Sequence, residues 1–202
     1  MQEEPAKETE PNAFGYIKEN SIYLIKGDFL YYYENGFYGQ PEGQALVLAL
    51  EEAALLIERN RIIIYRTTDL KEIFPIDELI EYFSSIDIYF WGRYLVYKDL
   101  RSRGYVVRPG FGNLTPYRRY PRGTKPNSAQ SDTFIFPFLE GTFLQLHELD
   151  LIVNQAQSNR KALILGCVDR SGDVTYYRTS EFQIPFNHER YEWPDEKKEI
   201  TN

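Results

Sequence analysis

Short runs of β-branched and aromatic residues alternate with amphipathic segments along most of the chain, and this alternation constrains the fold more than any other feature. The run Ile-Ile-Ile-Tyr at 62–65 is typical of a buried strand. It follows a segment, residues 50–59, in which apolar residues recur at helical spacing with glutamates on the other positions. Strands interleaved with helices predict a mixed α/β fold of the α+β kind.

Local signals predict the other elements of the first half. Residues 21–25 and 29–33 are β-rich, and the Lys-Gly-Asp between them suits a tight turn, so they predict a hairpin. Residues 36–43 contain three glycines and a proline, which predicts a loop because these residues interrupt regular structure.

Two further helices are predicted around the middle of the chain. One is expected from a possible N-cap at residues 68–69 through to Phe83, with an interruption at Pro75. The other carries aromatic and apolar residues on one face of the segment 94–100 and ends at Gly104, which suits a left-handed C-cap. The remaining predicted elements are strands beginning at 105–107 and covering 134–138, 162–168 and 174–177, and a helix at about 146–159.

These elements predict two domains and two tails. Residues 1–14 lack apolar periodicity and are expected to form a disordered acidic tail. Residues 15–87 are predicted to form a small N-terminal mixed α/β domain, and residues 88–190 a C-terminal α/β domain with a central mixed sheet. Residues 191–202 are expected to form a second acidic tail. The chain has no internal repeat, so a tandem duplication is not expected.

The net charge of −7 argues against a chain that binds nucleic acid on its own through a broad basic surface. Basic residues nevertheless gather in the middle of the chain, and either an ordinary solvated face or a local RNA contact accounts for them. Four of them are the candidates for RNA binding: Arg118, Arg119, Arg122 and Lys125.

One cysteine, Cys167, excludes an internal disulfide framework and a multi-cysteine metal cluster, and it is expected to be a buried core residue. No apolar run approaches the roughly 20 residues that span a bilayer, and the first residues are unlike a signal peptide. We therefore expect a cytoplasmic protein without a membrane partner.

Four segments, in the right order, resemble the archaeal tRNA-splicing endonuclease family. They are residues 36–43 with the helix that follows, 94–107, 160–165 and 168–177, and Tyr-Leu-Val-Tyr-Lys-Asp-Leu-Arg at 94–101 is the most specific stretch. The resemblance implies that the C-terminal domain, residues 88–190, is nuclease-like, and that four such units assemble and cut both ends of a precursor-tRNA intron at a bulge-helix-bulge. It also implies chemistry without metal or cofactor, in which the 2′-hydroxyl attacks the adjacent phosphate and leaves a 2′,3′-cyclic phosphate and a 5′-hydroxyl.

That reaction needs a base, an acid and a cation, which tyrosine, histidine and lysine supply in active members. The resemblance places Tyr120 at the base position and Lys161 at the cation position. The acid position falls near Ser131, give or take one residue, and no histidine stands there. The only histidines are His147, at a predicted helix start, and His188, in the C-terminal part. A serine hydroxyl cannot replace an imidazole as acid near neutral pH.

A second departure lies on the helix before Lys161, where Asn154 stands at a position at which catalytic units tend to carry an arginine. The resemblance therefore implies a noncatalytic structural subunit that pairs with a histidine-bearing catalytic paralogue in a two-plus-two heterotetramer. Tyr120 and Lys161 are then relics of the family's site.

Two features are expected to contact the partner subunit. The segment Asp-Arg-Ser-Gly-Asp at 169–173 reads as a polar hairpin turn, and the resemblance implies that Asp169 and Asp173 dock into a basic pocket of the neighbouring unit. The apolar strand ending in Phe138 and the segment 182–186 are expected to form a β-edge that pairs with another subunit.

Two other functions stay open on the sequence. One is an active endonuclease in which another group replaces the histidine. The other is a stand-alone RNA-binding module that uses the four basic candidates with nearby tyrosines.

Overall fold

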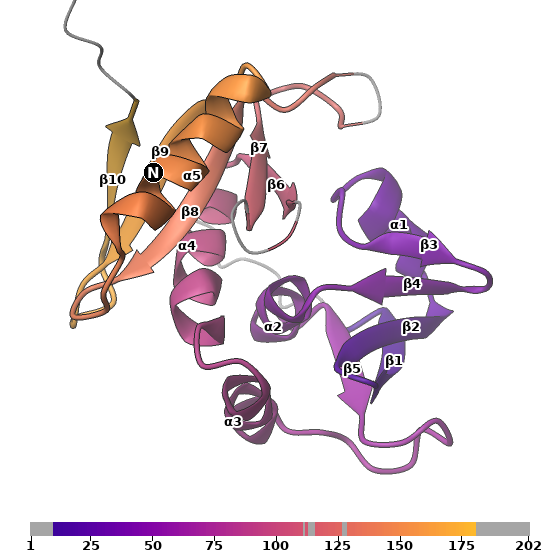
Figure 1. The fold of residues 1–202 in the computed structure, drawn as a ribbon. Coiled ribbons are helices and arrows are strands. Elements are labelled where there is room, and N and C mark those ends of the chain that lie inside the picture. Colours follow the sequence, from indigo (N-terminus) through magenta and orange to yellow (C-terminus); the bar gives the residue numbers. More distant parts are fainter. Residues whose placement is uncertain (1–9, 111, 113–115, 127–128, 181–202) are drawn as a thin grey trace, which may run out of the picture.

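The structure is a computed structural model, and it describes residues 10–180 apart from 111, 113–115 and 127–128. Two five-stranded mixed sheets lie side by side, with helices between and around them (Figure 1). The first half contains β1 (Ala13–Lys18), β2 (Ser21–Gly27), α1 (Phe29–Glu34), β3 (Gln40–Glu42), β4 (Ala45–Leu48), α2 (Leu50–Glu58), β5 (Ile62–Tyr65) and α3 (Ile76–Ile86). The second half contains α4 (Phe90–Ser102), β6 (Val106–Pro109), β7 (Tyr117–Tyr120), β8 (Thr133–Leu139), α5 (Leu146–Ser158), β9 (Ala162–Val168) and β10 (Val174–Thr179).

The N-terminal sheet has the strand order β3-β4-β2-β1-β5. Its neighbouring strands are antiparallel except β1 and β5, which are parallel. Helix α2 packs against it and is buried on almost every side, from Glu51 to Leu56. Its alanines and leucines supply the apolar face that the helical spacing predicts.

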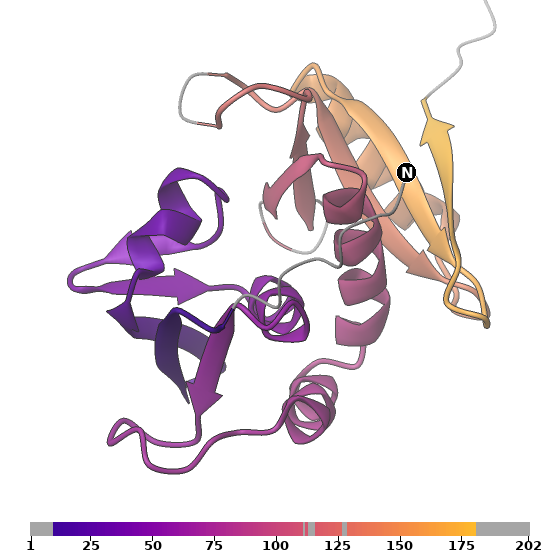
Figure 2. The same ribbon diagram turned by 180° about the vertical axis from the view of Figure 1, so that it is seen from behind.

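The C-terminal sheet has the strand order β10-β9-β8-β7-β6. Strands β8 and β9 are parallel, as a crossover through α5 requires, and the other neighbours are antiparallel. Helices α5 and α4 cover opposite faces of this sheet, as the views from front and back show (Figures 1 and 2). Side chains alternate accordingly, so Phe134 and Leu163 pack under α5 while Ile135 and Val107 join the core around α4.

One hydrophobic core runs through both halves. It contains residues of the N-terminal sheet, of α2 and α3, of α4, and of strands β6 to β9, whereas a smaller cluster lies beneath α5. Within the large core, Phe83 of α3 meets Phe90 of α4 edge to face at 5.2 Å between ring centroids. The predicted boundary between residues 87 and 88 falls between these two helices.

The structure confirms the mixed α/β fold and most elements with a strong local pattern. Strand β9 covers the predicted residues 162–168, and α2 and β5 lie where helical spacing and the isoleucine run predict them. Gly104 has a φ of +81° directly after α4, which is the left-handed conformation that a C-cap glycine supplies.

The predicted hairpin of residues 21–25 and 29–33 is wrong, because the second run is the helix α1. This helix buries Tyr32, whose hydroxyl contacts the Asn12 side chain and the carbonyl of Arg61. A turn at Gly27, with a φ of +79°, precedes it. Burial of one tyrosine at a tertiary contact thus overrides the β-propensity of the run.

Three other boundaries also need correction. The tail predicted for residues 1–14 ends too late, since Ala13 is fully buried in β1. The loop predicted at 36–43 includes the short strand β3. The helix expected from 68–69 begins only at Ile76, after Pro75, because proline suits a helix start and not its interior.

The predicted β-edge can be compared with the structure at strand β8, which contains Phe138. This strand pairs with β9 along its whole length but with β7 only from Thr133 to Ile135, so its second half has no paired strand on the β7 side among the described residues. The outermost strands of the sheet are β6 and β10. The other expected edge segment, 182–186, lies outside the described residues.

Candidate functional site

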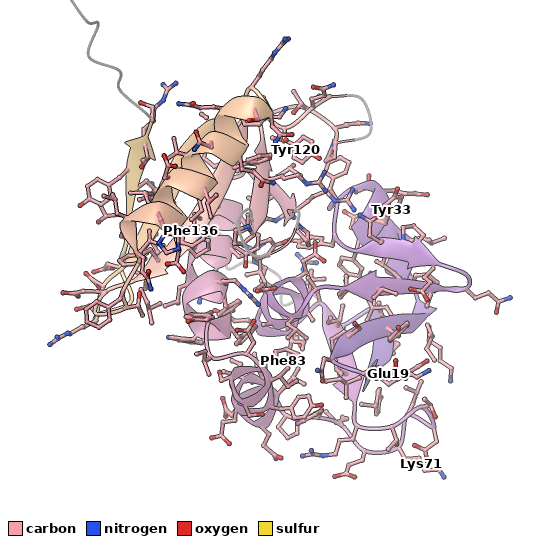
Figure 3. All side chains as sticks on the ribbon, in the orientation of Figure 1. Glu19, Tyr33, Lys71, Phe83, Tyr120 and Phe136 are labelled. Carbon is pink, nitrogen blue, oxygen red and sulfur yellow. The ribbon has the colours of Figure 1, made fainter. Side chains whose placement is uncertain are left out.

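Three strand ends meet at one end of the C-terminal sheet. Strand β7 ends at Tyr120, and because it is antiparallel to β8 its end lies beside the beginnings of β8 and β9. Lys161 immediately precedes β9, just past the C-terminus of α5. Figure 3 labels Tyr120 at this end of the sheet. The topology therefore brings together Tyr120 and Lys161, which are 41 positions apart in the sequence.

A pocket of about 250 Å³ lies at this junction. It is lined by Arg118, Tyr120, Ala129, Gln130, Ser131, Phe134, Asn159 and Lys161. Arg118, Phe134 and Lys161 share the α5 face of the sheet, as their register with Leu163 requires. The pocket thus combines a phenol, a guanidinium and an ammonium group, which suits an anionic ligand such as a phosphodiester.

Lys161 is held in place within this pocket. Its Nζ donates a hydrogen bond to the carbonyl oxygen of Ser131, on the segment that leads into β8. The backbone around it is tied on both sides, because Ala162 donates to the carbonyl of Asp132 at 3.0 Å and Asp132 donates to the carbonyl of Arg119 at 3.2 Å. The ammonium group is therefore positioned by the sheet and does not simply extend into solvent.

The acid position was predicted near Ser131, give or take one residue, and the three residues in this window differ in burial and contacts. Ser131 is buried and presents its main-chain carbonyl to Lys161. The Asp132 carboxylate forms an ion pair with Arg119 at 3.0 Å. Gln130 is exposed and lines the pocket, and sequence reasoning did not single it out. The prediction allowed one residue on either side of Ser131, so its window included Gln130.

The histidines do not come to this pocket in the part of the chain that the structure describes. His147 lies in the first turn of α5, whereas the pocket lies beyond its last turn. His147 precedes Ser158 by 11 positions along the helix, which corresponds to about 16 Å. His188 lies outside the described residues. Asn154 is exposed on α5 and donates to the Asp150 carboxylate at 3.0 Å.

The four basic candidates for RNA binding do not form one row. Arg118 faces the pocket, and its Nε donates to the Pro109 carbonyl at 3.0 Å. Arg119 points the other way, to the Thr133 hydroxyl at 2.8 Å and to Asp132. Arg119 and Arg122 also lie over the ring of Tyr105, at 4.9 and 4.5 Å from its centroid. Lys125 is exposed in the segment between β7 and β8.

The acidic pair lies in the turn between β9 and β10. The Asp169 carboxylate accepts from the backbone N–H groups of Ser171 at 2.8 Å and of Asp173 at 2.9 Å. Glu140, after β8, accepts from the N–H of Arg170 and so supports the turn from outside. Both aspartates are exposed, and Asp169 in addition organises the turn through these hydrogen bonds.

Two arginines of the basic middle segment form contacts between the two halves of the molecule. Arg101 and Arg108 donate to the carbonyls of Gly36 and Gly39, at 2.7 and 2.6 Å, and join the two halves of the molecule. Arg101 also lies 4.1 Å from the centroid of the Tyr38 ring. Long-range contacts of this kind have no local sequence signal, so they were not predicted.

The buried carboxylate of Glu52 lies in the same interface. Its Oε2 accepts from the N–H groups of Gly39 at 3.1 Å and Ala49 at 3.0 Å. Burial raises the pKa of Glu52 to about 7, although these two hydrogen bonds and the nearby arginines oppose the rise.

A larger hollow, of about 1010 Å³, lies between the two halves and away from Tyr120 and Lys161. The second half of β8, the residues after it and the start of α4 line much of it. Glu51 and Arg93, which form an ion pair at 2.7 Å, also line it. Phe143 beside it is almost fully exposed. The hollow lacks the residues of the predicted chemistry.

Comparison with known proteins identifies the family. The model of the tRNA intron endonuclease N-terminal domain matches residues 15–78, and that of the tRNA intron endonuclease catalytic C-terminal domain matches residues 90–176. The chain belongs to the tRNA-splicing endonuclease family. The tRNA-splicing endonuclease of Pyrococcus horikoshii is 34% identical over 171 residues, which cover 80% of this chain and 96% of that protein.

Two other archaeal tRNA-splicing endonucleases show the same similarity. That of Thermococcus kodakarensis is 34% identical over 72% of this chain and 83% of its own length. That of Methanococcoides burtonii is 32% identical over 92% of this chain, but the chain spans only about half of it, 51%. The most specific stretch of the resemblance, residues 94–101, lies within α4 and reaches almost to its end.

Two predictions made outside the site have separate outcomes. In the described residues, no helix has the length and apolar character needed to cross a membrane. Cys167 is only partly buried in β9, which corrects the expectation of a fully buried core residue, and burial raises the pKa of its thiol.

Proposed function

We propose that this chain is a noncatalytic structural subunit of a heterotetrameric tRNA-splicing endonuclease. Two such chains would combine with two catalytic, histidine-bearing chains to excise introns from precursor tRNA at bulge-helix-bulge sites. The observation that carries the proposal is the composition of the pocket, which contains Tyr120 and Lys161 but no imidazole among the described residues that line it.

The chemistry explains why this composition matters. In the cleavage step the 2′-oxygen forms a bond to phosphorus and the bond from phosphorus to the 5′-oxygen breaks. A base takes the proton of the 2′-hydroxyl, and an acid supplies a proton to the departing 5′-oxygen. Tyr120 lies where the base is expected, and the Lys161 ammonium group can stabilise charge on the phosphoryl oxygens. Without a proton donor, the rate is expected to fall by about 10² to 10⁴.

The proposed assembly uses other parts of the molecule. The turn between β9 and β10 presents Asp173 to solvent, where a basic pocket of a catalytic subunit could receive it. Pairing between subunits through a strand would involve the second half of β8, which contains Phe138 and has no described strand on its β7 side, or the outermost strands β6 and β10.

Cleavage of a bulge-helix-bulge RNA tests the proposal. The purified chain alone is expected to leave this RNA intact, whereas the chain mixed with its histidine-bearing paralogue is expected to cut it at both sites and to leave 2′,3′-cyclic phosphate and 5′-hydroxyl ends. A fully paired RNA of the same length serves as the control substrate. Efficient cleavage by the chain alone would overturn the proposal in favour of an active enzyme with a replaced histidine. Strong, salt-sensitive RNA binding by the chain alone would instead favour the RNA-binding module.

A further inference from the structure

A group of basic and aromatic side chains lies at the same end of the C-terminal sheet as the Tyr120 pocket, but on the opposite face. Arg119 pairs with Val107, which belongs to the core around α4, so its side chain points away from the pocket that the next residue, Tyr120, lines. The guanidinium carbons of Arg119 and Arg122 lie 4.9 and 4.5 Å from the centroid of the Tyr105 ring. We call Tyr105, Arg119 and Arg122 the arginine–tyrosine cluster.

The backbone holds Arg122 in a defined place. This residue stands at the second position of a turn from Pro121 to Thr124, and Gly123 at the third position has a φ of +76°. The N–H of Thr124 donates to the Pro121 carbonyl at 3.3 Å, and the Thr124 hydroxyl donates to the same oxygen at 2.7 Å. A left-handed glycine at the third position is typical of such a closed turn. Because the turn directly follows β7, Arg122 is fixed next to the end of the sheet.

Arg122 is the member of the cluster whose charge is left for a ligand. Arg119 forms an ion pair with the Asp132 carboxylate at 3.0 Å. Asp99, near the end of α4, is likewise engaged, by an ion pair at 2.7 Å with the arginine four positions on. Among the residues that the structure describes, the ring of Tyr105 is the one group that engages the Arg122 side chain.

This arrangement suits a phosphate group. A guanidinium stacked on an aromatic ring keeps its N–H groups free at the rim, and two of them can donate to two oxygens of one phosphate. We infer that the Arg122 guanidinium, held on the Tyr105 ring, binds a backbone phosphate of the precursor RNA beside the Tyr120 pocket. The inference rests on the proposed function, which supplies the identity of the RNA. The subunit then holds the RNA directly, in addition to contacting its partner.

Two anion-binding groups close together point to a strand and not to a single anion. The pocket presents Arg118 and Lys161 with Tyr120 on one face of the sheet, and Arg122 lies on the other, two positions beyond Tyr120 in the sequence. Neighbouring phosphates of a polynucleotide can occupy both places, whereas a free phosphate occupies one. Because the chain has a net charge of −7, its RNA contacts have to be local ones of this kind.

Titration of a bulge-helix-bulge RNA at several salt concentrations tests the inference. The protein is the complex with the paralogue, whose catalytic histidine is replaced by alanine to prevent cleavage, and the chain alone is measured in parallel. Arg122→Gln is expected to weaken RNA binding by about 10-fold at low salt and to reduce the slope of log K against log salt by about 0.7 to 0.9. Arg61→Gln, at an exposed arginine directly before β5, is the matched control and should leave both quantities unchanged.

Variants of Tyr105 test the stacking. Tyr105→Phe keeps the aromatic ring and should bind RNA as wild type does, whereas Tyr105→Leu should weaken binding without any change of charge. The double variant Tyr105→Leu, Arg122→Gln should bind about as well as Arg122→Gln alone, because both changes remove the same contact. Melting temperatures are recorded for each variant, since Tyr105 packs against the large core.

Steady-state cleavage by the complex with the active paralogue separates RNA positioning from a structural role. Arg122→Gln should raise KM and leave kcat unchanged, because the proton transfers take place in the pocket of the paralogue. A fall in kcat together with a lower melting temperature would assign Arg122 a structural role and overturn the inference.

Three other outcomes would also overturn it. The first is an unchanged affinity and salt slope for Arg122→Gln. The second is a weaker tetramer in native mass spectrometry with unchanged RNA binding, which would make the cluster a contact between subunits. The third is tight binding of inorganic phosphate by wild type that Arg122→Gln loses, which would make it a site for free phosphate. Cleavage by the wild-type chain alone would contradict the proposed function, whereas the salt slope of Arg122→Gln would still decide this inference.

Discussion

At the scale of single residues, the buried carboxyl group of Glu52 changes its protonation near neutral pH. Only 1% of it is exposed, and its Oε1 has no hydrogen-bond partner among the described residues. Its pKa is about 7 in the folded chain against 4.5 for an ordinary glutamate, because burial disfavours the charged form. The folded state therefore keeps a proton that the unfolded state has already lost between these two values. This contribution to stability is complete below pH 4.5 and disappears as pH rises through 7.

We expect Glu52→Gln to remove this dependence. A neutral amide has the same shape, and its oxygen can keep the two hydrogen bonds from Gly39 and Ala49. Between pH 4.5 and 8, the free energy of unfolding of wild type should fall by about 3 kcal/mol relative to the variant. Urea unfolding across this range measures the difference. Glu81→Gln, on the exposed part of α3, is the control, and its free energy of unfolding should change with pH as that of wild type does. If the free energy of unfolding of Glu52→Gln also follows wild type across this range, Glu52 is not the titrating group.

At the scale of elements, β1 depends on the absence of a side chain at Gly15. This residue pairs with Leu24 of β2 and with Ile64 of β5, next to a register shift in β1. A Cβ here would lie 2.1 Å from the backbone oxygen of Tyr23, so the strands would have to separate.

We expect Gly15→Ala to lower the free energy of unfolding by about 3 kcal/mol, because a backbone contact cannot be relieved by a rotamer change. Gly43→Ala is the matched control. Gly43 has a φ of +57° with open space around it, so its cost is conformational only, about 1 kcal/mol. Thermal and chemical unfolding compare the two variants. Equal effects would mean that the close approach at Gly15 does not limit the sheet.

The elements that could be predicted from the sequence are those whose pattern is local and regular. Helix α2 and strand β9 combine clear periodicity with ordinary end signals. Helix α1 was missed because its residues favour strands, and burial of Tyr32 against Arg61 decides its conformation. Strand β1 was missed because its pairing with β5 is non-local and its short run contains a glycine.

For the whole molecule, the resemblance brought Tyr120 and Lys161 to attention, and the topology of the sheet explains why they meet. The surroundings of the predicted acid position needed coordinates, because the burial of Ser131 and the contact of its carbonyl with Lys161 have no local signal in the sequence. The contacts of Arg101 and Arg108 also needed coordinates. The basic residues near these arginines in the sequence suggest a basic surface. The carbonyls that accept their hydrogen bonds, on Gly36 and Gly39, lie about 65 to 70 positions away in the sequence.

The two aspartates of the turn between β9 and β10 differ in what their replacement would change, and this difference allows a test of assembly with a catalytic subunit. The side chain of Asp169 accepts two backbone N–H groups within the turn, so its replacement would alter the turn and any contact together. Asp173 is exposed, and Asp173→Asn removes one charge and leaves these hydrogen bonds in place.

Under the proposed function, Asp173→Asn should weaken binding to the catalytic paralogue by about 10-fold at low salt, and less at high salt, because charge complementarity is screened. Native mass spectrometry and titration by calorimetry measure the tetramer and the affinity, with Glu42→Gln on β3 as a distant control of equal charge change. A tetramer of unchanged affinity at low salt would mean that this turn does not dock by charge.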